Sequence, residues 1–137
     1  VTSFERIVGR VLARLAPVLP MKKLDATAIS RNPAVVKAYQ SDPLVYLGAV
    51  PAATGIAMIT AIAEIEQQME AFRLPLLIVH GSADRLTNPE GSKQLYARAG
   101  STDKTFKLYD GLYHEVLNEP EQEQVMADIV AWLDQRI

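Results

Sequence analysis

The sequence predicts an α/β fold in which a small parallel sheet is covered by helices. Two strand-like segments, Leu76–His80 and Thr105–Tyr109, alternate with helix-like segments in the order helix, strand, helix, strand, helix. The chain has 137 residues, of which 49% are hydrophobic and 22% are charged. This length and composition suffice for one soluble globular domain with a buried core.

The first 50 or so residues are expected to form helical pieces joined by proline-containing loops. Apolar residues between Phe4 and Leu15 recur every three or four positions, which predicts an amphipathic helix ending near Pro17. A shorter helix is expected to begin near Pro33, with Ser30 or Asn32 as its cap, and to close before Pro43.

Residues 43–63 carry no charge over a length that could span a bilayer. Pro51, Gly48 and Gly55 interrupt this segment, and its alanines and threonines are only weakly apolar. We therefore expect a buried or interfacial segment instead of a membrane span.

The longest helix is predicted from about Ala53 to Phe72. One face carries an apolar stripe that we interpret as core, formed by Met58, Ile62, Ile65, Met69 and Phe72. The apolar run that follows lies between Pro75 and Gly81 and is typical of a strand buried on both faces of a parallel sheet.

A second helix is predicted after Asn88, which caps it, with Pro89 in the first position and Gly100 as the stop. The alternating segment Thr105–Tyr109 follows as the second strand. The last helix is expected in residues 119–137, where Val125, Ile129, Leu133 and Ile137 share a face.

Two chemically useful residues follow the two strands. Asp84 lies just past the first strand and His114 just past the second, and functional groups of parallel sheets gather beyond the carboxyl ends of the strands. A carboxylate that accepts the ring N–H of an imidazole orients it as a general base. The alternative is that Asp84 caps a turn and His114 is an ordinary loop histidine. We interpret His80, at the end of the first strand, as a histidine that bonds locally.

Residues 75–121 and the segment ISRNPAVVKAYQSDPLVY resemble α/β-hydrolases of the monoacylglycerol lipase and lysophospholipase type. The resemblance covers essentially the whole chain and implies the C-terminal part of that fold, with two parallel strands, flanking helices and a helical cap segment. It assigns residues 1–52 to the cap, which is a lid over the acyl pocket, and residues 53–137 to the core. It implies that Asp84 is the acid and His114 the base of a catalytic triad.

The nucleophile of this fold sits in a G-x-S-x-G elbow, and none of the six serines has glycines at these offsets. Because the triad order along the chain is serine, acid, histidine, we expect a truncated chain that lacks the nucleophile half and is inactive alone. The expected activity of the longer protein is hydrolysis of monoacylglycerols or similar single-chain lipid esters. Residues expected to line the acyl pocket are Leu44, Val45, Ile56 and Ile59.

Composition excludes several other function classes. Fourteen basic and sixteen acidic residues give a net charge of −2 without a basic run, so a nucleic-acid partner is not expected. The absence of cysteine and the presence of only two histidines argue against a metal site, and no cofactor is implied. We expect a cytoplasmic or membrane-peripheral location.

Three further expectations concern partners and alternatives. The strand Leu76–His80 is expected to have an open edge through which the chain could associate with itself. The missing N-terminal half of the fold is a second expected partner, and the lipid ester is the substrate. The alternatives are a non-catalytic remnant or interaction module of hydrolase origin, or another α/β-hydrolase reaction on the same Asp/His pair.

Overall fold

The structure is a computed structural model that describes residue 11 and residues 14–136. Its internal contacts divide the chain into two compact units. Unit 1 comprises Val1–Leu24 and Tyr46–Gln68, and unit 2 comprises Asp25–Val45 and Met69–Ile137. The assignment of residues 1–52 to a cap and 53–137 to a core is a functional division and stays a prediction.

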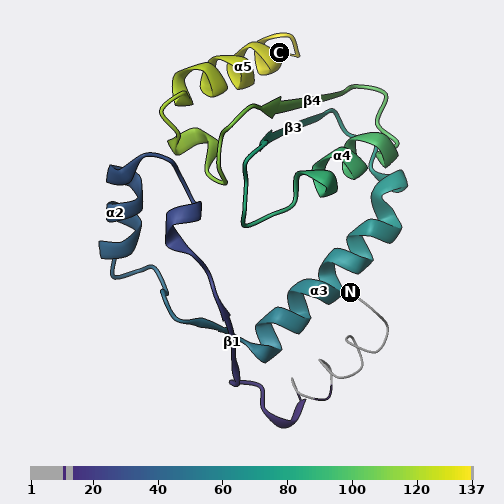
Figure 1. Cartoon of the computed structure of the whole chain (residues 1–137). Helices are drawn as coiled ribbons and strands as arrows, with labels where there is room; N and C mark the ends of the chain where they lie inside the picture. The colour runs from purple at the N-terminus through teal and green to yellow at the C-terminus, as the bar shows by residue number, and fades with distance from the viewer. Residues whose placement is uncertain (1–10, 12–13, 137) are drawn as a thin grey trace. The chain divides into compact units, whose positions relative to one another are not determined.

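Unit 2 contains a parallel pair of strands, β3 (Leu76–Gly81) and β4 (Lys104–Tyr109), which lie side by side in Figure 1. Both were predicted from sequence, and Ile78 pairs with Phe106 at the centre of their register. β3 is less buried than its continuous apolar sequence suggests, because only Ile78 and Gly81 are buried and the other four residues are half-buried.

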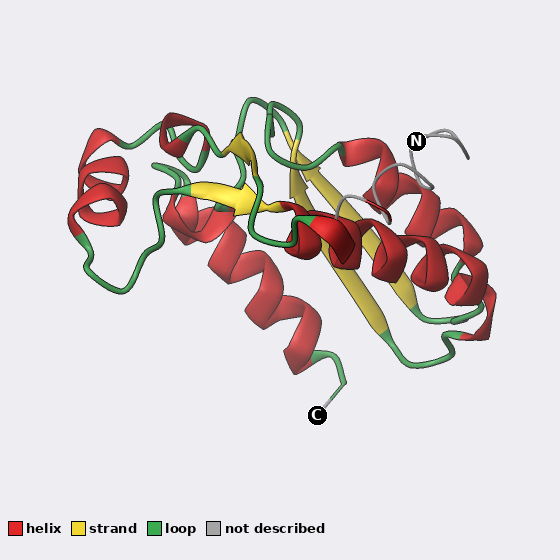
Figure 2. Cartoon of the chain, turned by 90° about the horizontal axis from the view of Figure 1, so that it is seen from below, coloured by secondary structure: helices red, strands yellow, loops and turns green. Residues whose placement is uncertain are grey.

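Two helices, α4 (Pro89–Arg98) and α5 (Gln122–Asp134), pack on opposite faces of this strand pair, as Figures 1 and 2 show. The alternation of side chains along β4 decides which helix each residue meets. Phe106 packs against Tyr96 of α4 with ring centroids 5.9 Å apart. Thr105 and Tyr109, on the other face, bond to Trp132 and Asp128 of α5 at 3.2 and 2.9 Å.

The core of unit 2 lies under α5. Leu112, Val116 and Val125 are buried together there, with Val79, Tyr109 and Ile129 packed around them. The predicted apolar face of the last helix thus contributes Val125 and Ile129 to a core. Leu133 is 46% exposed, and Ile137 lies outside the described residues.

Local capping signals were predicted correctly at two helices. Asn88 caps α4 by accepting the amide of Glu90 at 3.0 Å, and Pro89 is the first helical residue. Asn32, and not Ser30, caps α2 (Pro33–Ser41), where it accepts the amide of Ala34 at 3.0 Å. In both caps the side-chain oxygen of an asparagine accepts a backbone amide of the first turn, which has no partner within the helix.

Unit 1 contains α3 (Ala52–Gln68) and an antiparallel strand pair, β1 (Pro20–Lys23) with β2 (Ala49–Pro51). This pair was not predicted, since its strands are short and contain prolines. It places the carbonyls of Pro17 and Leu19 against the first amides of α3, at 3.1 and 2.9 Å. The amphipathic helix predicted from Phe4 falls almost entirely outside the described residues.

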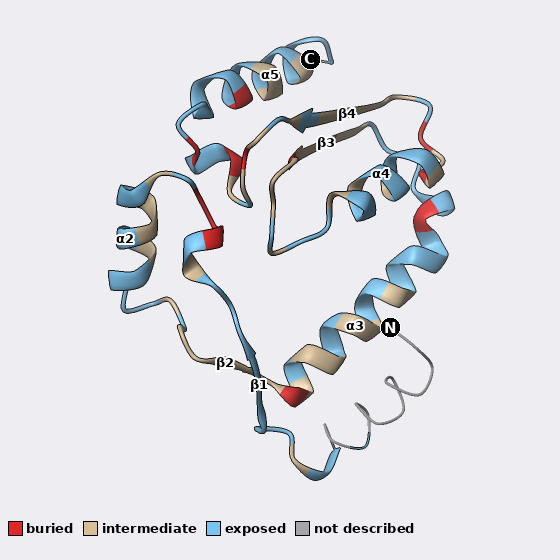
Figure 3. Ribbon diagram, viewed as in Figure 1, coloured by how far each residue is buried: buried red, intermediate tan, exposed pale blue. Residues whose placement is uncertain are grey.

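The apolar stripe predicted to be core on the longest helix is mostly exposed, as the pale blue of Figure 3 shows for α3. Met58, Ile62 and Ile65 are 57%, 52% and 58% exposed, whereas Met69 is buried. The helix also ends earlier than predicted, at Gln68, and continues as a 3-10 turn, η2 (Met69–Ala71). Periodicity indicates that a face is apolar, but not what covers it. None of the described helices is long and apolar enough to cross a membrane.

Candidate active site

The loops that follow β3 and β4 are bonded to each other at the carboxyl ends of the strands. The amides of Ser82 and Ala83 donate to the carbonyls of Tyr109 and Leu112 at 2.8 and 3.0 Å. Gly81 permits this approach, because a Cβ at this position would overlap the carbonyl oxygens of Leu112 and Tyr113. The loop carrying His114 is therefore held directly against the end of β3.

The structure brings Asp84 and His114 together. His114 Nδ1 lies 2.9 Å from Asp84 Oδ2, and the Asp84 side chain is only 2% exposed, against 38% for His114. An ionised carboxylate only accepts hydrogen bonds, so Nδ1 carries the proton that His114 donates to Asp84. The neutral ring then has its basic lone pair on Nε2.

Asp84 is held by the turn that follows it. Its Oδ1 accepts the amides of Leu86 at 2.7 Å and Thr87 at 3.0 Å, while the Thr87 hydroxyl donates to Oδ2 at 2.7 Å. Burial by itself raises the pKa of Asp84, but the hydrogen bonds from Thr87, His114 and Leu86 outweigh it and lower the pKa to about 2. The carboxylate therefore caps a turn and contacts the histidine at the same time, and it is ionised at neutral pH.

His80 and Thr87 are site residues that sequence reasoning did not assign to the pair. His80 was expected to bond locally, but its Nδ1 lies 2.7 Å from the hydroxyl of Ser92, twelve positions further along the chain in α4, and its Nε2 lies 3.2 Å from Asp84 Oδ2. The spacing D-x-x-T was the available signal for Thr87, because a hydroxyl three residues after an aspartate can donate to it within one turn.

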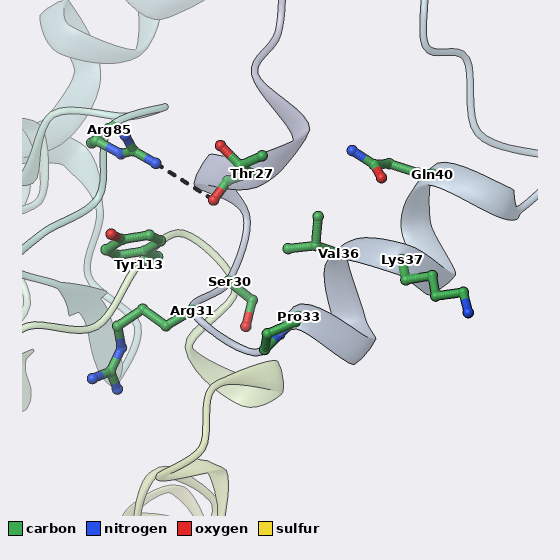
Figure 4. Close-up of a pocket in the computed structure, with 9 residues that line it drawn as sticks. All are labelled: Thr27, Ser30, Arg31, Pro33, Val36, Lys37, Gln40, Arg85 and Tyr113. Carbon is green, nitrogen blue, oxygen red and sulfur yellow. Dashed lines mark hydrogen bonds between the residues drawn. The ribbon is translucent and has the colours of Figure 1, made fainter.

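A cavity of about 500 Å³ is lined by nine residues, drawn as sticks in Figure 4, which include the sequence neighbours of the pair, Arg85 and Tyr113, but not Asp84 or His114. It is lined on one side by residues between Thr27 and Gln40 and on the other by Arg85 and Tyr113. Arg85 directly follows Asp84, Tyr113 directly precedes His114, and the Arg85 guanidinium lies 5.0 Å from the centre of the Tyr113 ring. None of the nine lining residues was selected from the sequence as a pocket residue, although Ser30 and Pro33 were named for their places at the start of a helix.

The four residues expected to line an acyl pocket are divided between the two units. Leu44 and Val45 follow α2 in unit 2, where Leu44 is 93% exposed, and Ile56 and Ile59 are half-buried on α3 in unit 1. Their role stays a prediction.

The serine hydroxyls of the described chain bond to groups other than His114. Ser92 contacts His80, Ser82 donates to Asp110, and the remaining described serines, Ser30, Ser41 and Ser101, donate to backbone carbonyls. Ser3 lies outside the described residues. The described residues therefore show a hydrogen-bonded pair of Asp84 and His114, but no serine hydroxyl bonded to His114.

Comparison with known proteins places these features in a family. Residues 1–121 match the Hydrolase_4 family, described as serine aminopeptidase, S33. The chain is 47% identical over 126 residues to a monoacylglycerol lipase of Mycolicibacterium smegmatis, covering 92% of this chain and 45% of that protein. It is 35% identical over 137 residues to human monoglyceride lipase, covering 98% of this chain and 45% of that protein.

A solved structure of a relative has the same fold over nearly all of this chain. The crystal structure of a monoacylglycerol lipase from Paleococcus ferrophilus superposes with a TM-score of 0.84 at 34% identity, over 97% of this chain and 52% of that one. The chain thus spans about half the length of the relatives it matches. The fold and the sequence together show that this chain has part of the α/β-hydrolase fold and belongs to the Hydrolase_4 family.

Proposed function

We propose that the chain supplies the acid and the base of a serine carboxylic ester hydrolase that acts on monoacylglycerols or similar single-chain lipid esters. The observation that carries this proposal is the 2.9 Å contact between His114 Nδ1 and the buried, ionised carboxylate of Asp84. The nucleophilic serine comes from sequence outside these 137 residues, in a G-x-S-x-G elbow.

The proposed reaction uses His114 twice. Nε2 removes the hydroxyl proton of the serine while the serine oxygen attacks the ester carbonyl, and Asp84 stabilises the imidazolium that forms. The imidazolium then protonates the departing alcohol oxygen as the C–O bond breaks, which leaves an acyl-enzyme. Water repeats the sequence, with His114 as base and then as acid, and releases the fatty acid and the serine.

The substrate class rests on the relatives. The family description names a peptidase, but both reported relatives and the superposed structure are named as monoglyceride or monoacylglycerol lipases. Peptide and ester cleavage share the same acyl transfer, so the acid and base fit either. The identity of 47% to a lipase favours the ester. The acyl chain would contact Leu44, Val45, Ile56 and Ile59.

The test is reconstitution with the missing half. We expect the 137-residue chain alone to hydrolyse a soluble ester no faster than free imidazole and to remain unlabelled by a fluorophosphonate probe. The reason is that none of the described serines has its hydroxyl bonded to His114, so the histidine has no positioned nucleophile to activate. Co-expression with the N-terminal half of the Mycolicibacterium smegmatis relative should restore monoacylglycerol hydrolysis.

Two variants separate catalysis from assembly in that pair. His114→Ala should remove nearly all turnover and leave the two halves associated, whereas Glu123→Gln, an exposed change on α5, should leave turnover unchanged. Assembly without turnover in the unmodified pair would favour the alternative of a non-catalytic remnant. Fluorophosphonate labelling of the chain alone would show that one of its own serines is the nucleophile.

A further inference from the structure

We propose that Ser82 is a positioning residue for His114. Its hydroxyl holds the turn with which the loop that carries His114 begins, and thereby sets how the imidazole meets Asp84. The inference rests on the proposed role of Asp84 and His114 as acid and base. It assigns a function to a serine that lies two residues before the acid and whose hydroxyl is bonded away from His114.

Ser82 contacts three consecutive residues at the point where the chain leaves β4. Its amide donates to the carbonyl of Tyr109 at 2.8 Å. Its hydroxyl oxygen accepts the amide of Gly111 at 2.8 Å, and its hydroxyl donates to Asp110 Oδ1 at 3.0 Å. One half-buried residue after β3 therefore sets the path of the chain three residues before His114.

The direction of both side-chain bonds follows from the partners. A backbone amide can only donate, so the Ser82 oxygen accepts from Gly111, and the single hydroxyl proton is left for the Asp110 carboxylate. Gly111 has a φ of 72°, a left-handed conformation that glycine adopts without strain but shares with many others. The bond from its amide to Ser82 stabilises this one conformation of the turn.

The turn and the Asp84–His114 pair are neighbouring links between the same two loops. Three links join these loops in sequence order: Ser82 to Gly111 at 2.8 Å, Ala83 to Leu112 at 3.0 Å, and Asp84 to His114 at 2.9 Å. The first link lies next to the point where both chains leave their strands. A turn that loses it can shift, and the shift is carried along the loop to the His114 ring.

The test is NMR spectroscopy of the isotopically labelled 137-residue chain. Ser82→Ala removes both hydroxyl bonds and leaves the Gly111 amide without this acceptor. The Nδ1 proton of His114 should then move to higher field, because its bond to Asp84 lengthens. Its exchange with solvent should become about tenfold faster, the factor that corresponds to about one net hydrogen bond.

The reconstituted enzyme gives a second readout. Ser82→Ala should lower kcat about tenfold and leave KM unchanged, because the variant disturbs the placement of the base and no group that is expected to contact the acyl chain. A loss of folded protein alone would lower the amount of active enzyme and would leave the His114 proton of the folded molecules unchanged.

Three further variants make the test specific. Ser82→Thr keeps the hydroxyl and should restore the His114 signal and kcat. Asp110→Ala keeps the bond from Gly111 to Ser82 and should shift the signal in the same direction as Ser82→Ala, but less. Ser101→Ala is the matched control, because the Ser101 hydroxyl donates to the Asp103 carbonyl at 2.9 Å and accepts the Asp103 amide at 3.2 Å, at the opposite end of β4. It should lower stability without moving the His114 proton.

The role of Ser82 is overturned if Ser82→Ala leaves the His114 proton unchanged, or if Ser101→Ala or Ser82→Thr shifts it equally. Should Ser82→Ala fail to fold, Asp110→Ala decides alone, since an unchanged His114 proton in that variant would overturn the role as well. The NMR signal does not need the nucleophile. An inactive reconstituted enzyme with the expected shift would therefore reject only the proposed function, and an active enzyme with an unchanged signal would reject only the role of Ser82.

Discussion

Replacing Arg31 by methionine should destabilise unit 2 far more than a surface ion pair would. Glu119 is 1% exposed, and its carboxylate accepts the Arg31 amide at 2.8 Å and the Arg31 Nε at 2.6 Å. Methionine keeps the apolar stem of the arginine but leaves a buried carboxylate with one backbone donor.

The magnitude follows from the burial of the pair. Removing one partner of a buried ion pair costs ~3–5 kcal/mol. The Arg31 side chain is 33% exposed, and its amide still donates in the variant, so water and the backbone offset part of that cost. We expect the free energy of unfolding to fall by about 2 to 3 kcal/mol, which is less than the full cost of a completely buried pair.

The assay is urea unfolding followed by circular dichroism at pH 7. Glu121→Gln is the matched control, because Glu121 contacts the same guanidinium but its side chain is 49% exposed, and its loss should cost under ~1 kcal/mol. The double variant Arg31→Met with Glu119→Leu should recover most of the stability, since a buried pair replaced by apolar residues is often neutral. Equal losses for Arg31→Met and Glu121→Gln would refute the reasoning.

Three more outcomes follow from the site and the sheet. Gly81→Ala should destabilise the chain by ~1–3 kcal/mol, because the added Cβ would meet the carbonyls of the loop that carries His114. The NMR signal of the His114 proton that is hydrogen-bonded to Asp84 should then disappear. Gly55→Ala is the control, because a Cβ at this position meets open space, and it should be neutral or stabilising. The pKa of Asp84 is about 2 in the folded chain and ~3.9 when unfolded, so the folded state binds fewer protons. This group should therefore add about 2 kcal/mol of stability that is present above pH ~4 and lost as the pH falls toward 2, and Asp84→Asn should lack that component in acid titrations of unfolding. One edge of β3 is covered by no described strand, so we expect chains to associate through it. Light scattering should then show an average mass that rises with protein concentration, and a strictly monomeric chain would contradict this.

The sequence alone determined the elements whose signals are local. β3 and β4 were predicted because their apolar and alternating patterns are complete within six residues each. The caps Asn32 and Asn88 were predicted because an N-cap acts on the next two or three residues. Asp84 and His114 were selected by their places after two parallel strands and by resemblance to a family.

Only the tertiary structure decided the contacts between distant segments. The bond from Arg31 to Glu119 joins residues 88 positions apart, and no pattern near either residue announces it. The same holds for the β1–β2 pair, whose strands are more than 20 positions apart. The physical reason is that local patterns specify dihedral preferences and apolar faces, whereas the partner of a buried charge or of a hydrophobic face is set by which segments the folded chain brings together.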